Sequence, residues 1–476
     1  MTGSEPVSIA PQAAGRSSLL QTVRDALNGS HQDYTQGSIG RALLLLAIPM
    51  VLEMALESVF AVTDVFFVGK LGANAVATVG LTESFLTIIY SMAMGISIGV
   101  SAIVARRIGE NDPDDAARSA VQAVWLGLAI AIVLGVTGSL LAPRLLALLG
   151  ASPAVLATGT TFARIMLGGE VSIIMLFIVN ASLRGAGDAA IAMRVLWLAN
   201  GINIVLDPLL IFGVGPFPHL GVTGAAIATT TGRTIGALFA LSRLVRSSGR
   251  LHVERKHLRL DLSVLRRIIS LASSATFQML IGTASWIGLV RIMSTFGSQA
   301  LAGYTIGVRV IIFALLPAWG ICNAAATMVG QALGAKNPDR AERSVWMAAR
   351  YNAFVLGIIG LLFVVFADAI TAIFTNDPTV HTYATNCLRI ASFGFPLFAF
   401  GGVITQSFNG AGDTWTPTTL NFIVFWLFEI PLAYLLAHPM HLGPNGIFYA
   451  IAVVFSVLAF VSAIIFRRGT WKTQVV

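Results

Sequence analysis

Long runs of apolar residues, separated by short polar stretches, recur along the whole chain. Each run holds about twenty residues or more, the length of helix that crosses a hydrocarbon core of about 30 Å at about 1.5 Å per residue. The runs are continuous rather than alternating, which excludes a membrane β-barrel and leaves helices to satisfy the backbone in lipid. The pattern predicts twelve spans, at 42–68, 77–104, 119–142, 160–182, 189–213, 222–246, 268–294, 300–330, 344–373, 381–408, 415–437 and 445–467.

Composition and charge agree with this prediction. Only 11% of residues are charged, whereas a soluble chain carries about 25%. Most of the 30 Lys and Arg residues fall in the two tails and after the even-numbered spans, eight of them in 243–267, while the opposite loops hold Lys70 and Arg144. This asymmetry predicts a multi-pass protein of the plasma (inner) membrane with both termini in the cytoplasm. The basic charge therefore orients the chain in the lipid bilayer, and we expect no nucleic-acid partner.

The tail and the cysteines add little chemistry. Residues 1–37 contain no continuous apolar stretch of the kind that a cleavable signal peptide needs. Within them SSLLQTVRDALNG could form a short amphipathic helix on the membrane surface or be disordered, and we expect disorder. Cys322 and Cys387 fall inside spans without ligand spacing, so we interpret them as small packing residues.

The two halves of the chain are related by a constant offset. IGENDPDDAARS at 108–119 corresponds to LGAKNPDRAERS at 333–344, and the same offset of 225 relates Gly185 in RGAGD to Gly410 in NGAGD. Each half thus has six spans and the same orientation, which implies parallel repeats. Secondary transporters commonly have this arrangement, with the substrate site between the repeats. The alternative is a duplicated bundle without a role in transport.

The predicted fold is an all-α membrane protein whose twelve transmembrane helices form two pseudo-symmetric six-helix lobes. The expected divisions are a cytoplasmic N-terminal tail (1–40), an N-lobe (41–246), a cytoplasmic inter-lobe loop (247–267), a C-lobe (268–467) and a C-terminal tail (468–476).

Acidic residues inside the spans are few, and they gather in the first half. An acid at mid-membrane costs roughly 2.5–3.5 kcal/mol on insertion scales, so the default interpretation is functional. In the first span Glu53, Glu57 and Asp64 are spaced by four and seven, on one helical face. Glu53 and Glu57 could line a cavity or be protonated packing residues.

A second polar face lies in the fifth span. Asn200, Asn203 and Asp207 are spaced by three and four, and Thr229 lies on the following span. Counted from the ends of the spans, Asp64, Asp207 and Thr229 lie roughly 7–11 Å below the outer surface. Two nearby carboxylates would either hold a cation or take up a proton, so the set predicts a cation site.

Pro208 supports the same interpretation, because it lacks an N–H and frees the carbonyl of Ile204 as a ligand. The alternative is that Asp207 bonds Asn203 or a backbone amide and only locks the packing.

The second half is poorer in acids. Gln278 corresponds to Glu53, and Leu289 to Asp64. Glu429 could be a second protonatable site or the partner of an arginine, and we favour the arginine. Arg233 lies mid-span and needs a buried partner that the sequence does not name.

These residues also give the chain a resemblance to a known family. The chain resembles the multidrug and toxic compound extrusion (MATE) transporters over about 40–467, and most closely their DinF-like branch. The matching pieces, in order, are VTDVFFVGKLGANAVATVG, ARRIGENDPDDAARSA, SLRGAGD, NIVLDPLLIFG and GVTGAAIATT. The resemblance implies two six-helix lobes around a central cleft that opens alternately to the two sides.

The resemblance also implies a role for single residues. The coupling-ion site would comprise Asp64, Asn203, Asp207, Thr229 and the carbonyl of Ala225.

As residues that line the cavity or relay protons, we expect Glu57, Glu53, Asn180, Asn200, Gln278 and Glu429. Two positions depart from the family pattern: Phe60 replaces a tyrosine, and Gln278 replaces an acid that another branch carries.

The function implied is an antiporter that uses H⁺ or Na⁺ as its coupling ion, with no other cofactor, to export amphipathic or cationic small molecules by alternating access. We expect a monomer. The sequence does not choose between the two ions, because carboxylates and hydroxyls suit both. The alternatives are a flippase of a lipid-linked precursor, which needs basic residues crowding the cleft, a channel, and an intramembrane enzyme. The enzyme is disfavoured because all seven histidines fall in tails, loops or at a span edge.

Overall fold

The computed structural model describes residues 19–29, 33–246 and 249–474, and the regular elements in these ranges are all helical. The first half contains α1 (Leu19–Asn28), α2 (Ile39–Gly69), α3 (Ala73–Gly109), α4 (Pro113–Leu148), α5 (Pro153–Gly168), α6 (Glu170–Ala186), α7 (Ala189–Phe212), α8 (Val222–Val245) and the short η1 (Arg255–Leu258). The second half contains α9 (Leu262–Met293), η2 (Ser294–Phe296), α10 (Ser298–Gly334), α11 (Pro338–Ala372), α12 (Pro378–Ser392), α13 (Phe395–Ala411), α14 (Trp415–Asn421), the π-helical η3 (Phe422–Glu429), α15 (Ile430–Ala437), α16 (Pro444–Arg467) and η4 (Thr470–Thr473).

Each predicted span falls on one helix or on consecutive helices. By length and composition, ten segments of the described chain can cross a membrane, and the pair α12 and α13, bent by 56°, makes an eleventh. The remaining span is α8, a helix of 24 residues whose threonines and glycines dilute its apolar character. The predicted all-helical membrane fold is therefore confirmed.

The backbone repeats with the sequence. Asn111 and Lys336, related by the offset of 225, both adopt positive φ, at 61° and 57°. Gly187 and Gly412 follow the same offset, with φ of 91° and 88°, where each ends a helix. The break between α5 and α6 likewise has its counterpart between α12 and α13.

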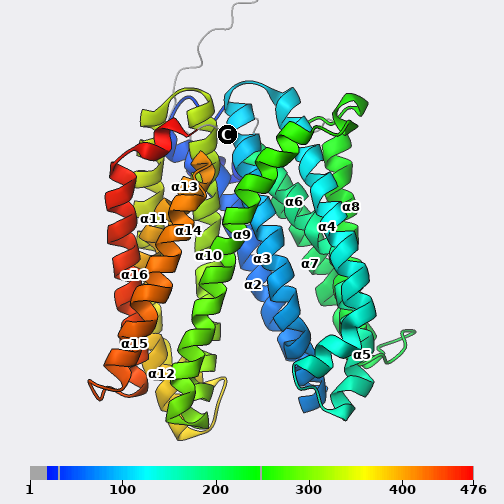
Figure 1. The fold of residues 1–476 in the computed structure, drawn as a ribbon, viewed down its shortest axis with the longest axis vertical. Helices are drawn as coiled ribbons and strands as arrows, with labels where there is room; N and C mark the ends of the chain where they lie inside the picture. Colours follow the sequence, from blue (N-terminus) through cyan, green and yellow to red (C-terminus); the bar gives the residue numbers. More distant parts are fainter. Residues whose placement is uncertain (1–18, 30–32, 247–248, 475–476) are drawn as a thin grey trace, which may run out of the picture.

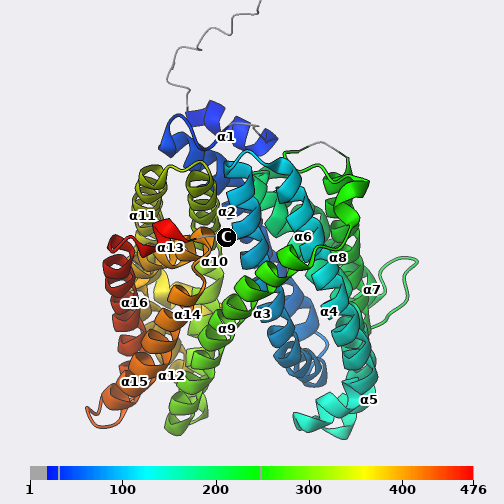
Figure 2. The same cartoon turned by 45° about the horizontal axis from the view of Figure 1, so that its top comes forward.

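The two repeats form two lobes. Figure 1 shows α4 to α8 on one side and α11 to α16 on the other, with α2, α3, α9 and α10 between them. These inner helices converge at the end of the bundle that carries α1 and the C-terminus, here called the α1 end, and diverge toward the opposite end (Figures 1 and 2).

Glycines allow the two lobes to approach closely at the α1 end. Gly109 of α3 faces the backbone of Gln331 on α10, and Gly334 of α10 faces the backbone of Arg106 on α3. Because Gly109 and Gly334 occupy equivalent positions of the two repeats, this seam is itself pseudo-symmetric. A side chain at either glycine would overlap with the opposing main chain.

The first helix of each repeat also packs across the seam. Gly320 of α10 faces the backbone of Met50 on α2, and Gly95 of α3 faces Ala272 on α9. Residues 42–50 of α2 accordingly belong to a hydrophobic core shared with α10, α11 and α13.

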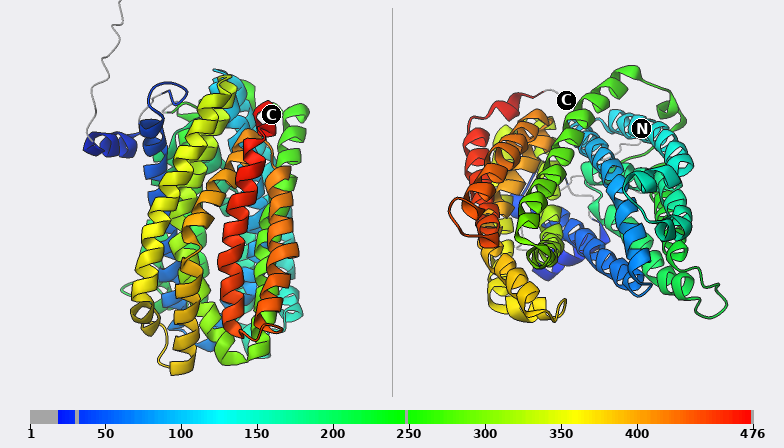
Figure 3. Two further views of the ribbon diagram at one scale, coloured as in Figure 1. Left: turned by 90° about the vertical axis from the view of Figure 1, so that its left-hand side faces the viewer. Right: turned by 60° about the horizontal axis from the view of Figure 1, so that its bottom comes forward.

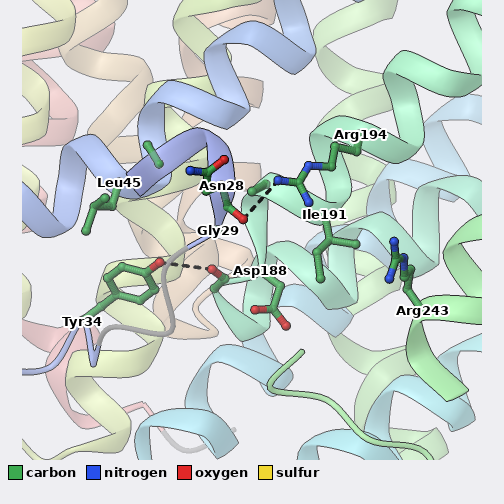
Figure 4. Close-up of a pocket in the computed structure, with 11 residues that line it drawn as sticks. Asn28, Gly29, Tyr34, Leu45, Asp188, Ile191, Arg194 and Arg243 are labelled. Carbon is green, nitrogen blue, oxygen red and sulfur yellow. Dashed lines mark hydrogen bonds between the residues drawn. The ribbon is translucent and has the colours of Figure 1, made fainter. Parts of the chain in front are cut away.

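The segment that the sequence predicted to be disordered forms α1, so that expectation is wrong. Figure 3 (left) shows α1 roughly perpendicular to the long axis of the bundle and projecting from its side near one end. Arg194 of α7 donates hydrogen bonds to the carbonyls of Leu27 (2.7 Å) and Asn28 (3.1 Å), and Tyr34 donates to the carbonyl of Gly187 (3.3 Å) (Figure 4). The two bonds from Arg194 satisfy carbonyls at the C-terminus of α1, and together with the bond from Tyr34 they fix this segment to the first lobe. Of the predicted tails and loop, residues 1–18, 30–32, 247–248 and 475–476 lie outside the described residues.

Candidate functional site

Three of the predicted ion ligands meet between α7 and α8. Asn203 donates a hydrogen bond from Nδ2 to Oγ1 of Thr229 at 2.9 Å, and Asp207 lies one turn further along α7. Asn203 is 2% exposed and Asp207 0%. Neither carboxylate oxygen of Asp207, nor Oδ1 of Asn203, has a hydrogen-bond partner among the described residues. Buried oxygens without partners are costly, and here they gather where hard cations or protons would satisfy them.

Asp64 and Ala225 complete this group. Asp64 is half-buried on α2, and its charge lies close enough to Asp207 to act on it. Ala225 is buried one turn from Thr229 on α8. Asp64 and Asp207 lie five residues before the ends of their helices, and Thr229 seven residues after the start of its own. At about 1.5 Å per residue, all three lie about 8–11 Å from the end opposite α1.

Pro208 lies inside α7 without ending it. A proline at this position removes one helical hydrogen bond, so the carbonyl of Ile204 loses its donor in the helix. This carbonyl adds a further oxygen close to Asp207.

A second polar layer lies one turn closer to the α1 end. Asn200 donates from Nδ2 to Oε2 of Glu57 at 2.8 Å. On α8, Arg233 lies four residues beyond Thr229 and donates from NH1 to the hydroxyl of Tyr90 at 2.8 Å. The partner that the sequence left unnamed for Arg233 is thus a tyrosine of α3.

Arg233 also faces an acid that the sequence analysis missed. Glu170, the first residue of α6, is 0% exposed, and neither of its carboxylate oxygens has a hydrogen-bond partner among the described residues. The charges of Glu170 and Glu57 both act on Arg233. An acid within the predicted span 160–182 was the available signal, and it should have been counted with the other intramembrane acids.

Glu53 forms the third layer. Its Oε1 accepts a hydrogen bond from NH1 of Arg184 on α6 at 2.6 Å, an ion pair between residues 131 positions apart. Glu53 is therefore an ion-pair partner, a role that neither of the two sequence interpretations included.

A cavity of about 110 Å³ lies between the two lobes next to this pair. Helices of both repeats contribute to its walls, which are formed by Met54, Met94, Ser97, Ile98, Ser101, Ala102, Phe177, Arg184, Met279, Trp319, Asn323, Ala326, Thr327, Gln406, Asn409 and Gly410. None of the six residues expected to line a cavity or relay protons is among them. The sequence analysis also missed Arg184, because nothing in the local pattern distinguishes it from a loop arginine at the end of a span.

Two of those expected residues lie away from the ion ligands. Asn180 is buried and donates to the carbonyl of Ala192 at 3.5 Å. Ala192 precedes Asn203 by eleven residues, or about 16 Å of helix. Gln278 is buried on α9, in the second repeat. The structure therefore does not bring Asn180 or Gln278 to the site formed by α7 and α8.

Glu429 is buried at the end of the π-helical η3, and its charge acts on Tyr304. It forms an ion pair with no arginine in the described chain, so the favoured interpretation of Glu429 as the partner of an arginine is wrong.

The sequence and the fold are similar to those of known membrane transporters. The MatE family model matches residues 49–209 and again 275–435. The chain is 26% identical over 430 residues to the probable multidrug resistance protein YoeA of Bacillus subtilis, covering 90% of this chain and 93% of that protein. It is 26% identical over 400 residues to the FAD transporter of Shewanella oneidensis, covering 83% and 87%.

A solved structure of a MOP superfamily transporter from Pyrococcus furiosus is similar to the whole bundle. Its TM-score is 0.87 at 25% identity, and the match covers 92% of this chain and 98% of that one. The two matches to the family model fall on the two repeats and together span about two thirds of the sequence. The chain therefore belongs to the MATE family, whose members are membrane transporters and not enzymes.

Proposed function

We propose that the protein is a cation-coupled antiporter of the DinF-like branch, which exports amphipathic small molecules from the cytoplasm by alternating access. The coupling ion, H⁺ or Na⁺, would bind in the first lobe at Asp64, Asn203, Asp207, Thr229 and the carbonyl of Ala225. The observation that carries this proposal is the set of buried oxygens of Asn203 and Asp207 that have no partner among the described residues.

The position of the site gives the direction of ion entry. We infer from the distribution of Lys and Arg that the protein lies in the inner membrane with its α1 end toward the cytoplasm. The ion site lies about 8–11 Å from the opposite end, so an ion would enter from outside, down its gradient. We take the transporter to be a monomer with both termini in the cytoplasm.

Electrostatics links the ion to the conformation. Without an ion, the carboxylates of Asp64 and Asp207 repel each other across a poorly solvated space. A bound cation or proton removes this repulsion and favours closer packing of α2 on α7. Export is driven if the ion and the substrate differ in their affinity for the two states of the bundle.

A chain of polar contacts leads from the ion site to the cavity. Asn203 lies one turn from Asn200, which holds Glu57. Glu57 lies one turn from Glu53, which holds Arg184 on the cavity wall. A change in packing around Asp207 would therefore reach the cavity through α2 and α7.

The relatives support export of small molecules, since one is named a probable multidrug resistance protein and another an FAD transporter. A flippase of a lipid-linked precursor would need several basic residues in the cavity, and Arg184 is the one basic residue among those that line it.

Ion binding tests this proposal on the purified protein. We expect Na⁺ titration, followed by calorimetry, or proton release, followed with a pH indicator, to report one saturable site that Asp207→Asn abolishes. Glu429→Gln is the matched control, a buried acid of the other lobe, and should leave binding unchanged. Saturable binding that survives Asp207→Asn and disappears in Glu429→Gln would place the ion site in the second lobe and refute the proposal.

A further inference from the structure

The charge of the cavity between the lobes is unusual for a pocket expected to receive cations. Among the residues that line it, Arg184 is the one charged side chain, and there is no carboxylate. The remaining polar groups are neutral amides and hydroxyls, and the apolar walls are Phe177, Trp319 and three methionines. Such walls suit a planar aromatic body, because methionine sulfur and aromatic rings both contact ring systems favourably.

The guanidinium of Arg184 is paired with Glu53 and still has N–H groups that bind no other described residue. Glu53, which is 1% exposed and is not among the residues that line the cavity, accepts a hydrogen bond from NH1 of Arg184 at 2.6 Å, while the Arg184 side chain is 14% exposed. Among the described residues, this is the one hydrogen bond that the Arg184 guanidinium donates. Since a guanidinium carries five N–H donors in a planar fork, donors remain for a ligand in the cavity.

The fold itself does not require this charge. In the second repeat, the position equivalent to Glu53 is Gln278 and the position equivalent to Arg184 is Asn409. Asn409 lines the same cavity, where its Nδ2 donates to Oε1 of Gln406 at 2.6 Å. One repeat thus holds a charged pair where the other holds two amides, and the positive charge lies on one wall only.

We propose that the cavity selects anionic substrates, with a planar aromatic body and a carboxylate or phosphate group that binds Arg184. This inference rests on the proposed export function and specifies its substrate class. In a medium of low dielectric constant a cation in the cavity would meet Arg184, which lines the cavity, before Glu53, the carboxylate paired with it, which does not line the cavity. An anion gains charge-assisted hydrogen bonds from the guanidinium, the strongest kind in proteins, although it also feels repulsion from Glu53 behind the arginine.

Flavins supply a matched pair of probes, because riboflavin and flavin mononucleotide share one ring system and differ by a phosphate. Rhodamine 6G serves as the planar cation. Binding to purified protein in nanodiscs, without any gradient, is followed by fluorescence. A hydrogen bond to a charged group contributes about 1.5–3 kcal/mol, so we expect the wild type to prefer flavin mononucleotide over riboflavin by roughly 10- to 100-fold.

The two members of the ion pair have opposite predicted effects. Arg184→Gln should remove the preference and leave the affinity for riboflavin unchanged. Glu53→Gln should strengthen binding of flavin mononucleotide, because it removes the repulsion behind the arginine. Arg389→Gln, which breaks the ion pair with Asp368 on α11, is the control and should change neither affinity.

A double variant tests the proposal if either single variant fails to fold. Glu53→Gln with Arg184→Asn copies the neutral pair of the second repeat, so the fold should tolerate it. It should bind the two flavins equally well.

Several outcomes would overturn the proposal. Equal affinity of the wild type for the two flavins, or binding of none of the three probes, would do so. So would tight binding of rhodamine 6G that Glu53→Gln abolishes, which would assign selection of cations to Glu53. If rhodamine 6G binds in this way and a gradient drives its export from proteoliposomes, the proposed export function stands and only the substrate class is wrong. If flavin mononucleotide binds as predicted but no gradient drives its export, the binding site stands and the proposed export function is rejected.

Discussion

Adding one methyl group on each side of the seam between the lobes should open the α1 end of the transporter. Gly109 and Gly334 lie at equivalent positions of the two repeats, and each faces the backbone of the other lobe. The change is the double substitution Gly109→Ala and Gly334→Ala. Both glycines are the last residues of their helices and neither has a positive φ, so their backbone accepts alanine and any adverse effect must come from the contact.

The structure sets the size of that effect. A Cβ on Gly109 would lie closest to the carbonyl oxygen of Gln331 and 2.7 Å from its carbonyl carbon, and one on Gly334 would lie closest to the carbonyl oxygen of Arg106 and 2.9 Å from the backbone nitrogen of Glu110. Carbon atoms are most favourable at about 3.5–4.0 Å, so the helices must separate by at least about 1 Å. Overpacking of this kind costs about 1–3 kcal/mol per site, enough to shift the balance between the two states of the bundle about 10-fold or more.

Spin labels report the shift. Arg118→Cys and Arg343→Cys are equivalent positions near the α1 end, and the native Cys322 and Cys387 are replaced by alanine. We expect the double glycine variant to populate longer distances between the labels, measured by double electron–electron resonance in nanodiscs. Identical distance distributions in a normally folded double variant would refute the reasoning.

Gly80→Ala is the matched control, because it lies on the same helix as Gly109 and its added Cβ would meet no atom within 4 Å. It should leave the distances unchanged. If Gly80→Ala lengthened them equally, the effect would come from helix propensity and not from the seam.

Three further substitutions test other contacts in the structure. Arg233→Gln should lower the free energy of unfolding by about 1–3 kcal/mol, because it removes the hydrogen bond to Tyr90 and the positive charge that acts on buried Glu170; thermal unfolding should show partial recovery in the double variant with Glu170→Gln, and no recovery would contradict the electrostatic coupling of the two residues. Thr229→Val should lower stability by about 1–3 kcal/mol and weaken ion binding, because the Nδ2 of Asn203 loses its acceptor, whereas Thr229→Ser should behave as the wild type in calorimetry. Asp261 caps α9, and the hydrogen bond from the serine two residues on holds the pKa of its carboxyl below the usual value. Asp261→Ala should therefore lower the free energy of unfolding by about 1 kcal/mol. This difference should be fully present above about pH 4 and should shrink as the pH falls through the lowered pKa of Asp261. Denaturation at several pH values measures it, and a difference that grows in acid would contradict the prediction.

Much of the fold follows from the sequence alone. Runs of apolar residues located all twelve spans, since the thickness of the bilayer sets their length. The offset of 225 predicted paired backbone features such as the positive φ at Asn111 and Lys336. Helical spacing also placed Asn203 and Asp207 on one face, opposite Thr229, because i, i+4 neighbours within one helix do not depend on tertiary packing.

Contacts between helices that are far apart in the sequence could not be predicted in this way. The Glu53–Arg184 pair and the bond from Arg233 to Tyr90 depend on the rotation and crossing of helices, which hydropathy leaves undetermined. Docking of α1 likewise depends on hydrogen bonds from a helix more than 160 residues away. Expecting disorder there was reasonable for a short isolated segment, because helices of ten residues are marginal without tertiary contacts.

Transport in proteoliposomes shows whether Asp207 couples an ion gradient to export. Export of flavin mononucleotide and of rhodamine 6G is measured with a sodium gradient alone, with a proton gradient alone and with neither, for the wild type and for Asp207→Asn. We expect one gradient to accelerate export by the wild type, and we expect Asp207→Asn to lose this acceleration while still binding the probe. Export that proceeds at the same rate with or without either gradient, and is unchanged by Asp207→Asn, would show that Asp207 is structural and that the protein is not a cation-coupled antiporter.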